Sequence, residues 1–579
     1  MQIHLHQTHH TLADFSTIFQ TLKSSIKRSG IHLYPELFLT GYPLADLCLS
    51  ASFIQRYQQF LEEINAWANS LPEQDDFVCL LGGLSYDLGP EGVPVDIRNV
   101  VYELKAGSSL REIYIKRLLP NYDIFDEQKY FTAGKTPGIW EFGGEKFGLL
   151  ICEDMWASSF HHLDPARELA KAGPFRAVFN LSASPFDIYK AQKRRDRARA
   201  LSTLFKAPFY YVNRVGGEDE ILFDGSSFGV NGFETLGIAP RFSQHILSLP
   251  LPLATQYLPV GDDLEENTWE SLFAAQFSAD KSLPRRLRVW DNDECEMITE
   301  ALKFGLQEYA QKSGFKKFLV ALSGGLDSSL VLTLVKMSLL PGQEVEAIYM
   351  PGNYSSPISW DLSSKLCLKL GVRLNSLPIK FLHSTIKMNF QGSFTESFEG
   401  LTDENVQSRL RGLLLYTRSN QTGAMVVNTS NKSEIAVGYS TQYGDSVGAI
   451  SLLGDVYKTE AYRLAEWINY KFGAVIPDGI IQRPPSAELR ADQKDQDNLP
   501  AYERLDAMLE GILSFRYTYK DLLTLGFSEE EVKKVFELYY KSEYKRRQFC
   551  PIIKIKSKSF GFGYRVPLTK NTGFYRPQP

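Results

Sequence analysis

The sequence predicts an α/β protein with at least two domains. A single hydrophobic core stops growing near about 250 to 300 residues, and this chain has 579. Short apolar strands alternate with helical stretches along the chain, and in the second half these strands are apolar throughout. Such strands are typical of a parallel sheet that helices cover on both faces.

The first half supplies strands and helices in turn. Helices are predicted over 51–70 and 189–207, and residues 224–240 are typical of a hairpin. The predicted strands are 77–86, 98–104, 146–154, 175–184 and 208–217.

The regular patterning weakens after residue 246. The segment 247–290 is rich in proline and then in acidic residues, and we predict that it links domains at 1–246 and 291–579. The strands expected in the second domain are 317–322, 344–350, 372–379 and 423–430.

Composition excludes several classes of protein. A net charge of -5 gives no electrostatic reason to expect nucleic acid or an anionic membrane as a partner. The six cysteines form no CxxC pair, which argues against zinc and thioredoxin-like sites and fits a reducing compartment. The sequence has neither a signal peptide nor a long apolar window, so we expect a cytoplasmic location.

The stretch "ALSGGLDSS", residues 321–329, follows an apolar strand and opens a helix. Its glycines let the backbone turn and expose N–H groups, and its serines add donors where a helix dipole favours an anion. Asp327 is itself an anion, so its presence is explained if Mg²⁺ lies between it and phosphate. A glycine turn with serine caps is the simpler alternative, but the whole pattern favours phosphate binding.

The GK[ST] ending of a Walker A loop is missing, and the stretch instead resembles the PP-loop of the ATP pyrophosphatases. Those enzymes split ATP between its α and β phosphates. The resemblance implies ATP contacts from Ala321, Leu322, Ser323, Gly324, Gly325, Leu326, Asp327, Ser328 and Ser329.

Segments further along the chain indicate which of the PP-loop enzymes the sequence resembles. They are "TDENVQSRLRG" from residue 402, "NTSNKSEIAVGYSTQYGD" at 428–445, "RPPSAELR" at 483–490 and "YKRRQF" from 544. In this order they resemble the NAD synthetase family in its glutamine-dependent, two-domain form. The resemblance implies that ATP adenylylates deamido-NAD⁺, after which ammonia completes the amide.

This chemistry calls for a cation beside the phosphates, because the attack of a carboxylate on the α-phosphate must overcome their charge. We expect Asp327 and Glu434 to bind Mg²⁺. The resemblance adds ATP contacts from Thr429 and Lys458, and deamido-NAD⁺ contacts from Asn405, Glu434, Asp445 and Lys545. Taken singly, each of these is more simply a helix cap or a solvated surface residue.

Three segments of the front half resemble the Glu-Lys-Cys site of the nitrilase superfamily. They are "YPELFLTGYP" with Glu36, "IYIKRLLPNYDIFDEQKYF" with Lys116 and Glu127, and "FGLLICEDMW" with Cys152. A buried cysteine, a surface lysine and a helix-start glutamate are the simpler interpretations of each residue alone. Together they predict a glutaminase that supplies the ammonia.

The expected roles follow from the chemistry of amide hydrolysis. Cys152 is the nucleophile, Glu36 the general base, and Lys116 stabilises the oxyanion with a backbone N–H near Glu153. Glu127 positions the lysine or the substrate. The resemblance places Tyr122, Ser184 and Lys190 around glutamine.

The resemblance implies a nitrilase-like α-β-β-α sandwich followed by a doubly wound, parallel-sheet PP-loop domain. Small molecules are the expected partners: deamido-NAD⁺, ATP and glutamine. We also expect a homo-oligomer and a tunnel that carries ammonia. Two alternatives stay open, a PP-loop amidotransferase with another acceptor and a nucleotide sensor with a degenerate amidase domain.

Overall fold

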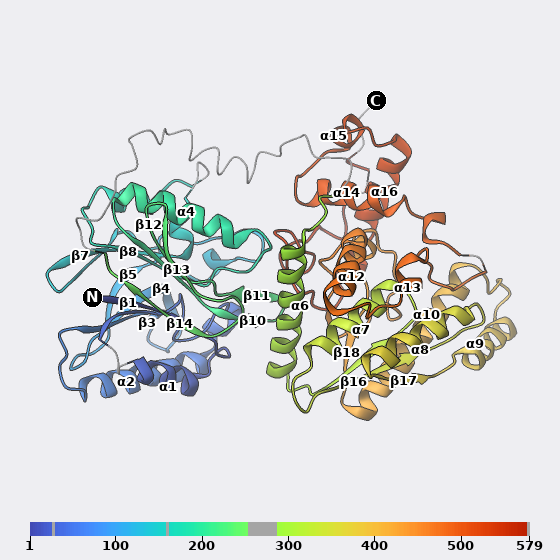
Figure 1. The fold of residues 1–579 in the computed structure, drawn as a ribbon, viewed down its shortest axis with the longest axis horizontal. Helices are drawn as coiled ribbons and strands as arrows, with labels where there is room; N and C mark the ends of the chain where they lie inside the picture. The colour runs from blue at the N-terminus through green and yellow to red at the C-terminus, as the bar shows by residue number, and fades with distance from the viewer. Residues whose placement is uncertain (26–28, 158–160, 253–286, 492, 572, 576–579) are drawn as a thin grey trace. The chain divides into compact units, whose positions relative to one another are not determined.

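The computed structural model describes residues 1–25, 29–157, 161–252, 287–491, 493–571 and 573–575. The chain divides into two compact units, Met1–Gln276 and Phe277–Pro579, each with its own sheets and cores (Figure 1). Most of the segment expected as a linker, 247–290, lies outside the described residues. Its first residues differ from the expectation, because 247–250 form the end of a paired strand.

The first unit contains two six-stranded sheets. The first has the order β14-β1-β2-β3-β4-β5, with β1, β2 and β3 parallel and the outer pairs antiparallel. Its strands are β1 (Gln2–Gln7), β2 (Gly30–Leu33), β3 (Phe77–Leu88), β4 (Pro94–Leu104), β5 (Arg111–Ile115) and β14 (His245–Pro250).

The second sheet has the order β13-β12-β9-β8-β7-β6, with β7, β8 and β9 parallel. Its strands are β6 (Gly138–Phe142), β7 (Glu145–Ile151), β8 (Val178–Ser182), β9 (Phe209–Asn213), β12 (Phe228–Asn231) and β13 (Glu234–Ile238). A separate ribbon pairs β10 (Val215–Glu218) with β11 (Ile221–Asp224). The hairpin expected at 224–240 is the β12–β13 pair.

The two sheets pack face to face, with helices on their outer faces. Leu5 and Leu80 of the first sheet share a core with Phe147 and Phe179 of the second. Helices α1 (Phe15–Ser25) and α2 (Ala51–Asn69) pack on the first sheet, and α3 (Pro165–Ala170) and α4 (Lys190–Phe205) on the second. The predicted α-β-β-α sandwich is confirmed.

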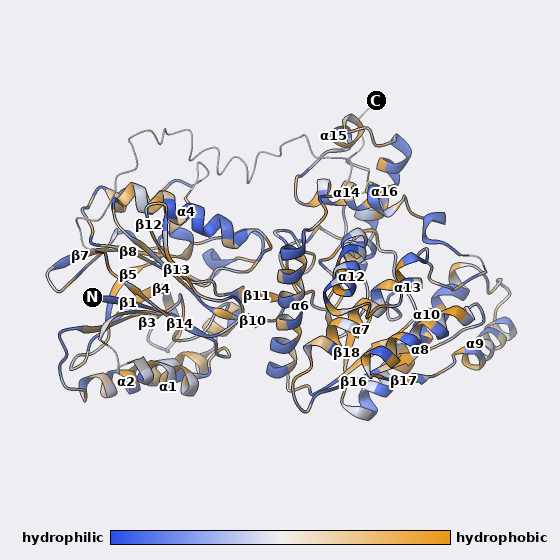
Figure 2. Cartoon of the chain, in the orientation of Figure 1, coloured by the Kyte–Doolittle hydropathy of each residue, from blue (hydrophilic) through white to orange (hydrophobic). Residues whose placement is uncertain are grey.

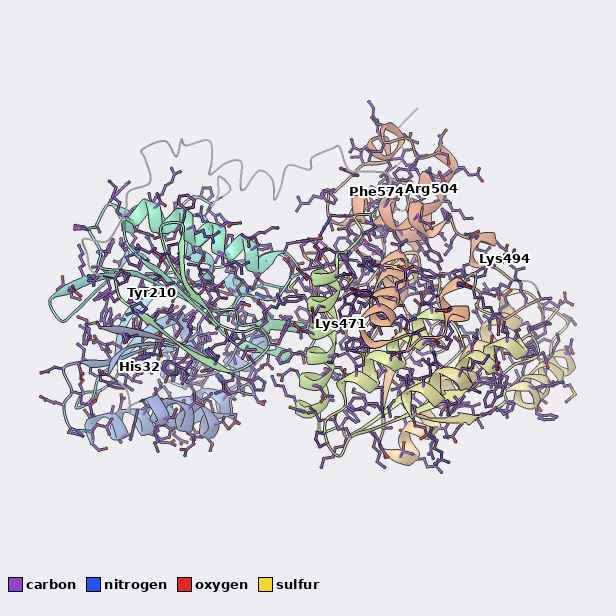
Figure 3. The ribbon with its side chains drawn as sticks, in the orientation of Figure 1. His32, Tyr210, Lys471, Lys494, Arg504 and Phe574 are labelled. Atoms are coloured by element: carbon purple, nitrogen blue, oxygen red, sulfur yellow. The ribbon has the colours of Figure 1, made fainter. Side chains whose placement is uncertain are left out.

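Hydropathy follows these layers (Figure 2). Orange strands lie inside the unit, whereas α4 is largely blue because it is rich in lysine and arginine, of which Arg194 and Arg197 are buried. Figure 3 labels one fully buried side chain from each sheet, His32 of β2 and Tyr210 of β9. Alternate residues of a strand point to opposite faces, so His32 packs on Phe77 while Ile31 and Leu33 enter the core between the sheets.

The second unit is built on one parallel sheet of order β17-β16-β15-β18-β19. Its strands are β15 (Lys317–Ala321), β16 (Glu344–Tyr349), β17 (Arg373–Ser376), β18 (Met425–Asn428) and β19 (Ile450–Ser451). The strand order reverses at β15, and in sheets of this kind ligands bind outside the carboxyl ends of the strands at such a point. The "ALSGGLDSS" stretch begins at that end of β15.

Helices cover both faces of this sheet. On one face α10 packs on β15 and β18 through Leu410 and Leu415, which share a core with Leu319 and Val426. Helix α7 also contacts β15, and it packs with α6 and α12. The helices are α6 (Asn292–Lys312), α7 (Leu326–Ser338), α8 (Pro357–Leu370), α9 (Lys380–Ser393), α10 (Leu401–Thr422), α12 (Lys458–Phe472) and α13 (Asp478–Gln482). The predicted doubly wound sheet is confirmed.

A helical cluster follows the sheet and has its own core, which includes Leu505, Leu509, Val532 and Phe536. Its helices are α11 (Lys432–Val437), α14 (Tyr502–Leu513), α15 (Tyr519–Thr524), α16 (Glu529–Lys541) and α17 (Glu543–Arg546). Short 3₁₀ helices are η1 (Ala45–Leu49), η2 (Glu127–Lys129), η3 (Cys152–Met155) and η5 (Asp495–Asp497). Within the described residues, none of the helices is long and apolar enough to cross a membrane.

Candidate active sites

Cys152 lies at a sharp turn between β7 and η3. Its φ of 42° is in the left-handed region, which non-glycine residues seldom adopt and which often marks functional sites. Two residues later, Asp154 closes the turn, because its Oδ2 accepts hydrogen bonds from the Ile151 backbone at 3.0 Å and the Tyr114 hydroxyl at 2.8 Å. These bonds therefore hold the backbone of the turn that carries Cys152.

Asp154 also joins this turn to the segment that carries the lysine. Its Oδ1 accepts the backbone N–H groups of Arg117 at 3.1 Å and Leu118 at 2.8 Å. Burial raises the pKa of Asp154 to about 6, although these hydrogen bonds oppose the shift. The sequence analysis missed Asp154, for which the available signal was an acid two residues after the candidate nucleophile.

Lys116 lies between two buried carboxylates. Its Nζ is 2.6 Å from Glu36 Oε1 and 2.8 Å from Glu127 Oε2, and none of the three side chains is more than 4% exposed. Burial alone would lower the pKa of Lys116, but the charges of Glu127 and Glu36 raise it well above its ordinary value. The lysine is therefore a fixed cation beside Cys152.

One cation faces two carboxylates, so the cluster holds an excess of negative charge. Burial raises the pKa of Glu127 to about 7, with Lys116 opposing and Glu36 adding to the shift. The Tyr42 hydroxyl donates to Glu127 Oε1 at 2.9 Å, and burial raises the pKa of Tyr42, so it is a neutral donor. Sequence reasoning missed Tyr42 although it stands in the same motif as Glu36.

Both oxygens of Glu36 are held in place. Oε1 accepts from Lys116 and from Asn99 Nδ2 at 2.8 Å, and Oε2 accepts from the Ala183 backbone at 2.9 Å. Burial raises the pKa of the Cys152 thiol well above its ordinary value, and the Glu36 charge adds to this. The thiol is thus protonated at rest, and a carboxylate is at hand to take its proton.

The three expected glutamine contacts lie on separate segments. The Tyr122 hydroxyl donates to Glu153 Oε1 at 3.0 Å, and Lys190 Nζ is 5.2 Å from the ring centre of Trp156. Ser184 is buried, and its hydroxyl accepts from Arg194 Nε at 3.2 Å.

In the second unit, a cavity of about 260 Å³ opens at the carboxyl end of β15. Its lining includes most of the expected residues: 321–328, Thr429, Glu434, Asp445 and Lys458. Gly324 has a φ of 82°, and a Cβ on it would lie 2.6 Å from the Ser359 carbonyl oxygen, so only glycine fits there.

Three expected residues are absent from this lining. Ser329 Oγ donates to the Gly325 carbonyl at 2.7 Å within the loop. Asn405 Oδ1 accepts from Thr441 Oγ1 at 2.7 Å, four residues before Asp445. Lys545 Nζ donates to the carbonyls of Gly438 at 2.7 Å and Ser440 at 2.6 Å. Asn405 and Lys545 therefore support the 438–445 segment that leads to Asp445.

Asp327, Glu434 and Lys458 form the charged centre of the cavity. Lys458 Nζ pairs with Asp327 Oδ2, and Asn431 Nδ2 donates to Asp327 Oδ1 at 3.2 Å. Burial and the Asp327 charge raise the pKa of Glu434 well above its ordinary value. Two carboxylates thus share a single lysine.

Residues that the sequence analysis did not assign also line the cavity, among them Arg411, Arg483, Glu488 and Asp495. Arg483 and Glu488 form an ion pair in the "RPPSAELR" segment, and Glu488 Oε1 accepts from Ser359 Oγ at 2.8 Å. The sequence showed this segment as a motif. No residue type or spacing in it indicated that it lines the same cavity as the loop after β15.

Comparison with known proteins finds relatives along nearly the whole chain. The profile of the NAD synthase family matches residues 298–549. A glutamine-dependent NAD(+) synthetase from Synechocystis sp. is 33% identical over 557 residues, which covers 95% of this chain and 94% of the relative. The chain belongs to the glutamine-dependent NAD(+) synthetase family. A glutamine-dependent NAD(+) synthetase from Thermotoga maritima is 33% identical over 98% of both chains.

A solved member of the glutamine-dependent NAD(+) synthetase family has the same fold. The structure of the glutamine-dependent NAD+ synthetase from Acinetobacter baumannii, in complex with adenosine diphosphate, matches with a TM-score of 0.70 and 29% identity. The match covers 98% of each chain. Similarity to this family therefore extends over both units, whereas the NAD synthase profile covers only part of the second.

Proposed function

We propose that this protein converts deamido-NAD⁺ to NAD⁺ by ATP-dependent amidation, with ammonia released from glutamine in its first unit. The products are NAD⁺, AMP, pyrophosphate and glutamate. The observation that carries the proposal is the buried Lys116, held between Glu36 and Glu127 beside Cys152, in one chain with the cavity after β15. Membership of the glutamine-dependent NAD(+) synthetase family supports it.

In the first unit, Glu36 takes the proton of Cys152 and the thiolate attacks the side-chain amide carbon of glutamine. Lys116 and the backbone N–H near Glu153 stabilise the oxyanion. The C–N bond breaks, and Glu36 returns the proton to the departing ammonia. Glu36 then deprotonates a water molecule that cleaves the thioester and releases glutamate. Tyr122, Ser184 and Lys190 hold glutamine.

In the second unit, the loop 321–329 and Thr429 bind ATP, and Lys458 contacts its phosphates as a point charge. The carboxylate of deamido-NAD⁺ attacks the α-phosphate, and pyrophosphate leaves. Ammonia then attacks the acyl carbon, and AMP departs with the acyl oxygen. Asn405, Glu434, Asp445 and Lys545 hold deamido-NAD⁺, either directly or through the 438–445 segment.

The cavity suits Mg²⁺. This ion prefers oxygen ligands and is commonly bound by one or two carboxylates together with substrate phosphates. The raised pKa of Glu434 beside Asp327 marks a pair of carboxylates that a further cation would stabilise. Asp327 and Glu434 would hold the ion, which supplies charge neutralisation for the transferring phosphate. No group of three His, Cys, Asp or Glu side chains in the described residues could hold a metal alone.

Ammonia in bulk water would be protonated and diluted, so we propose that a tunnel carries it between the sites. The test uses ¹⁵N-amide glutamine in a solution that contains unlabelled ammonium. Retention of ¹⁵N in NAD⁺ against the excess ammonium is expected. Equal dilution of the label by the ammonium pool would contradict the tunnel.

We also propose that the active form is a homo-oligomer. Phe381 and Met388, seven residues apart on α9, are 81% and 66% exposed, and large apolar side chains exposed on one face of a helix favour a protein contact. Mass photometry should give a multiple of the chain mass, and replacing Phe381 and Met388 with Asp should reduce it. A monomer at working concentrations would contradict this.

Exchange of pyrophosphate into ATP tests which molecule accepts the adenylyl group. Exchange of labelled pyrophosphate into ATP should require deamido-NAD⁺, whereas xanthosine monophosphate and aspartate should not support it. Exchange with either of these, but not with deamido-NAD⁺, would identify a PP-loop amidotransferase for another acceptor. Absence of exchange with any acceptor would favour a nucleotide sensor.

A further inference from the structure

One face of α14 carries three polar side chains that bond residues in or next to the cavity after β15. Tyr502, Asp506 and Glu510 are four residues apart, so they lie on the same side of the helix. Tyr502 is 6% exposed and Asp506 is fully buried. A polar stripe in that position needs bonding partners, because a buried carboxylate without them is costly.

The three side chains bond residues in or next to the cavity. The Tyr502 hydroxyl donates to Asp495 Oδ2 at 2.9 Å, and Asp495 lines the cavity. Glu510 Oε2 accepts from the Tyr457 hydroxyl at 2.9 Å, one residue before Lys458. Asp506 makes the largest set of these contacts.

Asp506 joins the first turns of α11 and α12. Its Oδ1 accepts from Ser433 Oγ at 2.5 Å, and its Oδ2 accepts from Thr459 N at 2.9 Å and Thr459 Oγ1 at 2.8 Å. Ser433 Oγ in turn accepts from the Lys458 backbone N–H at 2.9 Å. Both carboxylate oxygens are therefore committed to neighbours of the site.

Each residue that Asp506 binds is adjacent in sequence to a charged residue of the cavity. Ser433 precedes Glu434 on α11, and Thr459 follows Lys458 on α12. We propose that Asp506 is a positioning residue that sets Glu434 and Lys458 relative to each other for adenylylation. This inference rests on the proposed function. Asp506 contacts neither ATP nor the acceptor itself, but acts through the hydroxyl and backbone groups that it binds.

Asp506→Asn is the sharpest test, because it preserves volume while one carboxylate oxygen becomes an NH₂ donor. Facing Thr459, that donor would meet a backbone N–H that can only donate, so a hydrogen bond is lost. Facing Ser433, it would require the hydroxyl to rotate and accept, which reverses the Ser433 bond. A small misplacement of reacting groups can cost about 100-fold in rate. We expect kcat for NAD⁺ formation with ammonium to fall by about 10- to 100-fold, with a smaller rise in KM for deamido-NAD⁺, because Glu434 is only one of the proposed contacts to that substrate.

Glu531→Gln is the matched control. Glu531 of α16 pairs with Arg504 of the same helix α14 at 2.6 Å, and neither residue lines the cavity. This variant should lower the melting temperature but leave kcat unchanged. If it lowers kcat as much as Asp506→Asn does at an equal loss of melting temperature, Asp506 is merely structural and the proposal is overturned.

If Asp506→Asn does not fold, Thr459→Val and Ser433→Ala each remove one hydroxyl and leave the carboxylate in place. Each should lower kcat by a larger factor than it raises KM for deamido-NAD⁺, and the glutaminase rate of the first unit should not change. Wild-type kcat in both variants would overturn the proposal. Failure of the wild-type protein itself to form NAD⁺ from deamido-NAD⁺, ATP and ammonium would instead contradict the proposed function.

Discussion

Replacing Lys116 with Met removes the one cation that lies between two buried carboxylates. Its Nζ is within 2.8 Å of both Glu36 and Glu127. Removing one partner of a buried ion pair costs about 3 to 5 kcal/mol, because the other partner is left uncompensated. Loss of an oxyanion donor lowers kcat by about 100- to 1000-fold. We therefore expect a large loss of both glutaminase activity and stability.

The two losses can be separated. In Lys116→Met, the two carboxylates repel each other, so stability should fall more at pH 8 than at pH 6, where Glu127 can take up a proton. Adding Glu127→Gln should restore much of the stability without restoring glutamine hydrolysis. Glutamate release measures the first unit, and NAD⁺ formation with ammonium serves as the internal control for the second.

In Lys116→Met, glutamate release should fall by at least about 100-fold while the ammonium-dependent rate stays near that of the wild type. Retention of glutaminase within threefold of wild type would refute the role of Lys116. A double variant that regains activity together with stability would show that the lysine matters only for folding.

Three further changes test other contacts. Tyr42→Phe removes a donor to Glu127 worth about 1 kcal/mol, so glutamate release should fall about fivefold with the ammonium-dependent rate unchanged; an unchanged glutaminase rate would contradict this. The pKa of Asp154 is raised to about 6 from 3.8, so its contribution to stability is full below pH 3.8 and lost as pH rises through 6. The free energy of unfolding of the wild type minus that of Asp154→Asn should fall by about 3 kcal/mol across this window, and a flat difference in denaturant titrations would contradict it. Asp327→Asn removes the partner of Lys458, so NAD⁺ formation should fall by at least about 100-fold with either nitrogen source and need more Mg²⁺ for half-maximal rate, while glutamate release with glutamine alone persists; an unaltered Mg²⁺ dependence would exclude Asp327 as a ligand.

The sequence was informative where function sits at the end of an apolar strand. Cys152 follows β7 and the PP-loop follows β15, so the strand pattern placed both, although the role of Cys152 also required the family resemblance. The parallel sheet of the second unit also followed from continuously apolar strands. Lys116, Glu36 and Glu127 required the family resemblance, since each alone is an ordinary charged residue.

The site residues and strands that could not be predicted from the sequence depend on contacts between segments that are distant in the chain. Asp154 binds Arg117 and Leu118, which lie 37 and 36 positions earlier in the chain. Asp506 binds Ser433, which lies 73 positions earlier. Burial of a polar side chain has no local pattern, because the partners that stabilise it come from other elements. For the same reason, residues 247–250 of β14 were assigned to the linker, because the partner strand β1 lies at the other end of the first unit.

Cys152→Ala tests the central claim most directly. The variant keeps the fold of the turn but has no nucleophile, so NAD⁺ formation with glutamine should vanish while NAD⁺ formation with ammonium continues at the wild-type rate. Loss of both activities would contradict the division of labour between the two units, and persistence of the glutamine-dependent rate would show that Cys152 is not the nucleophile.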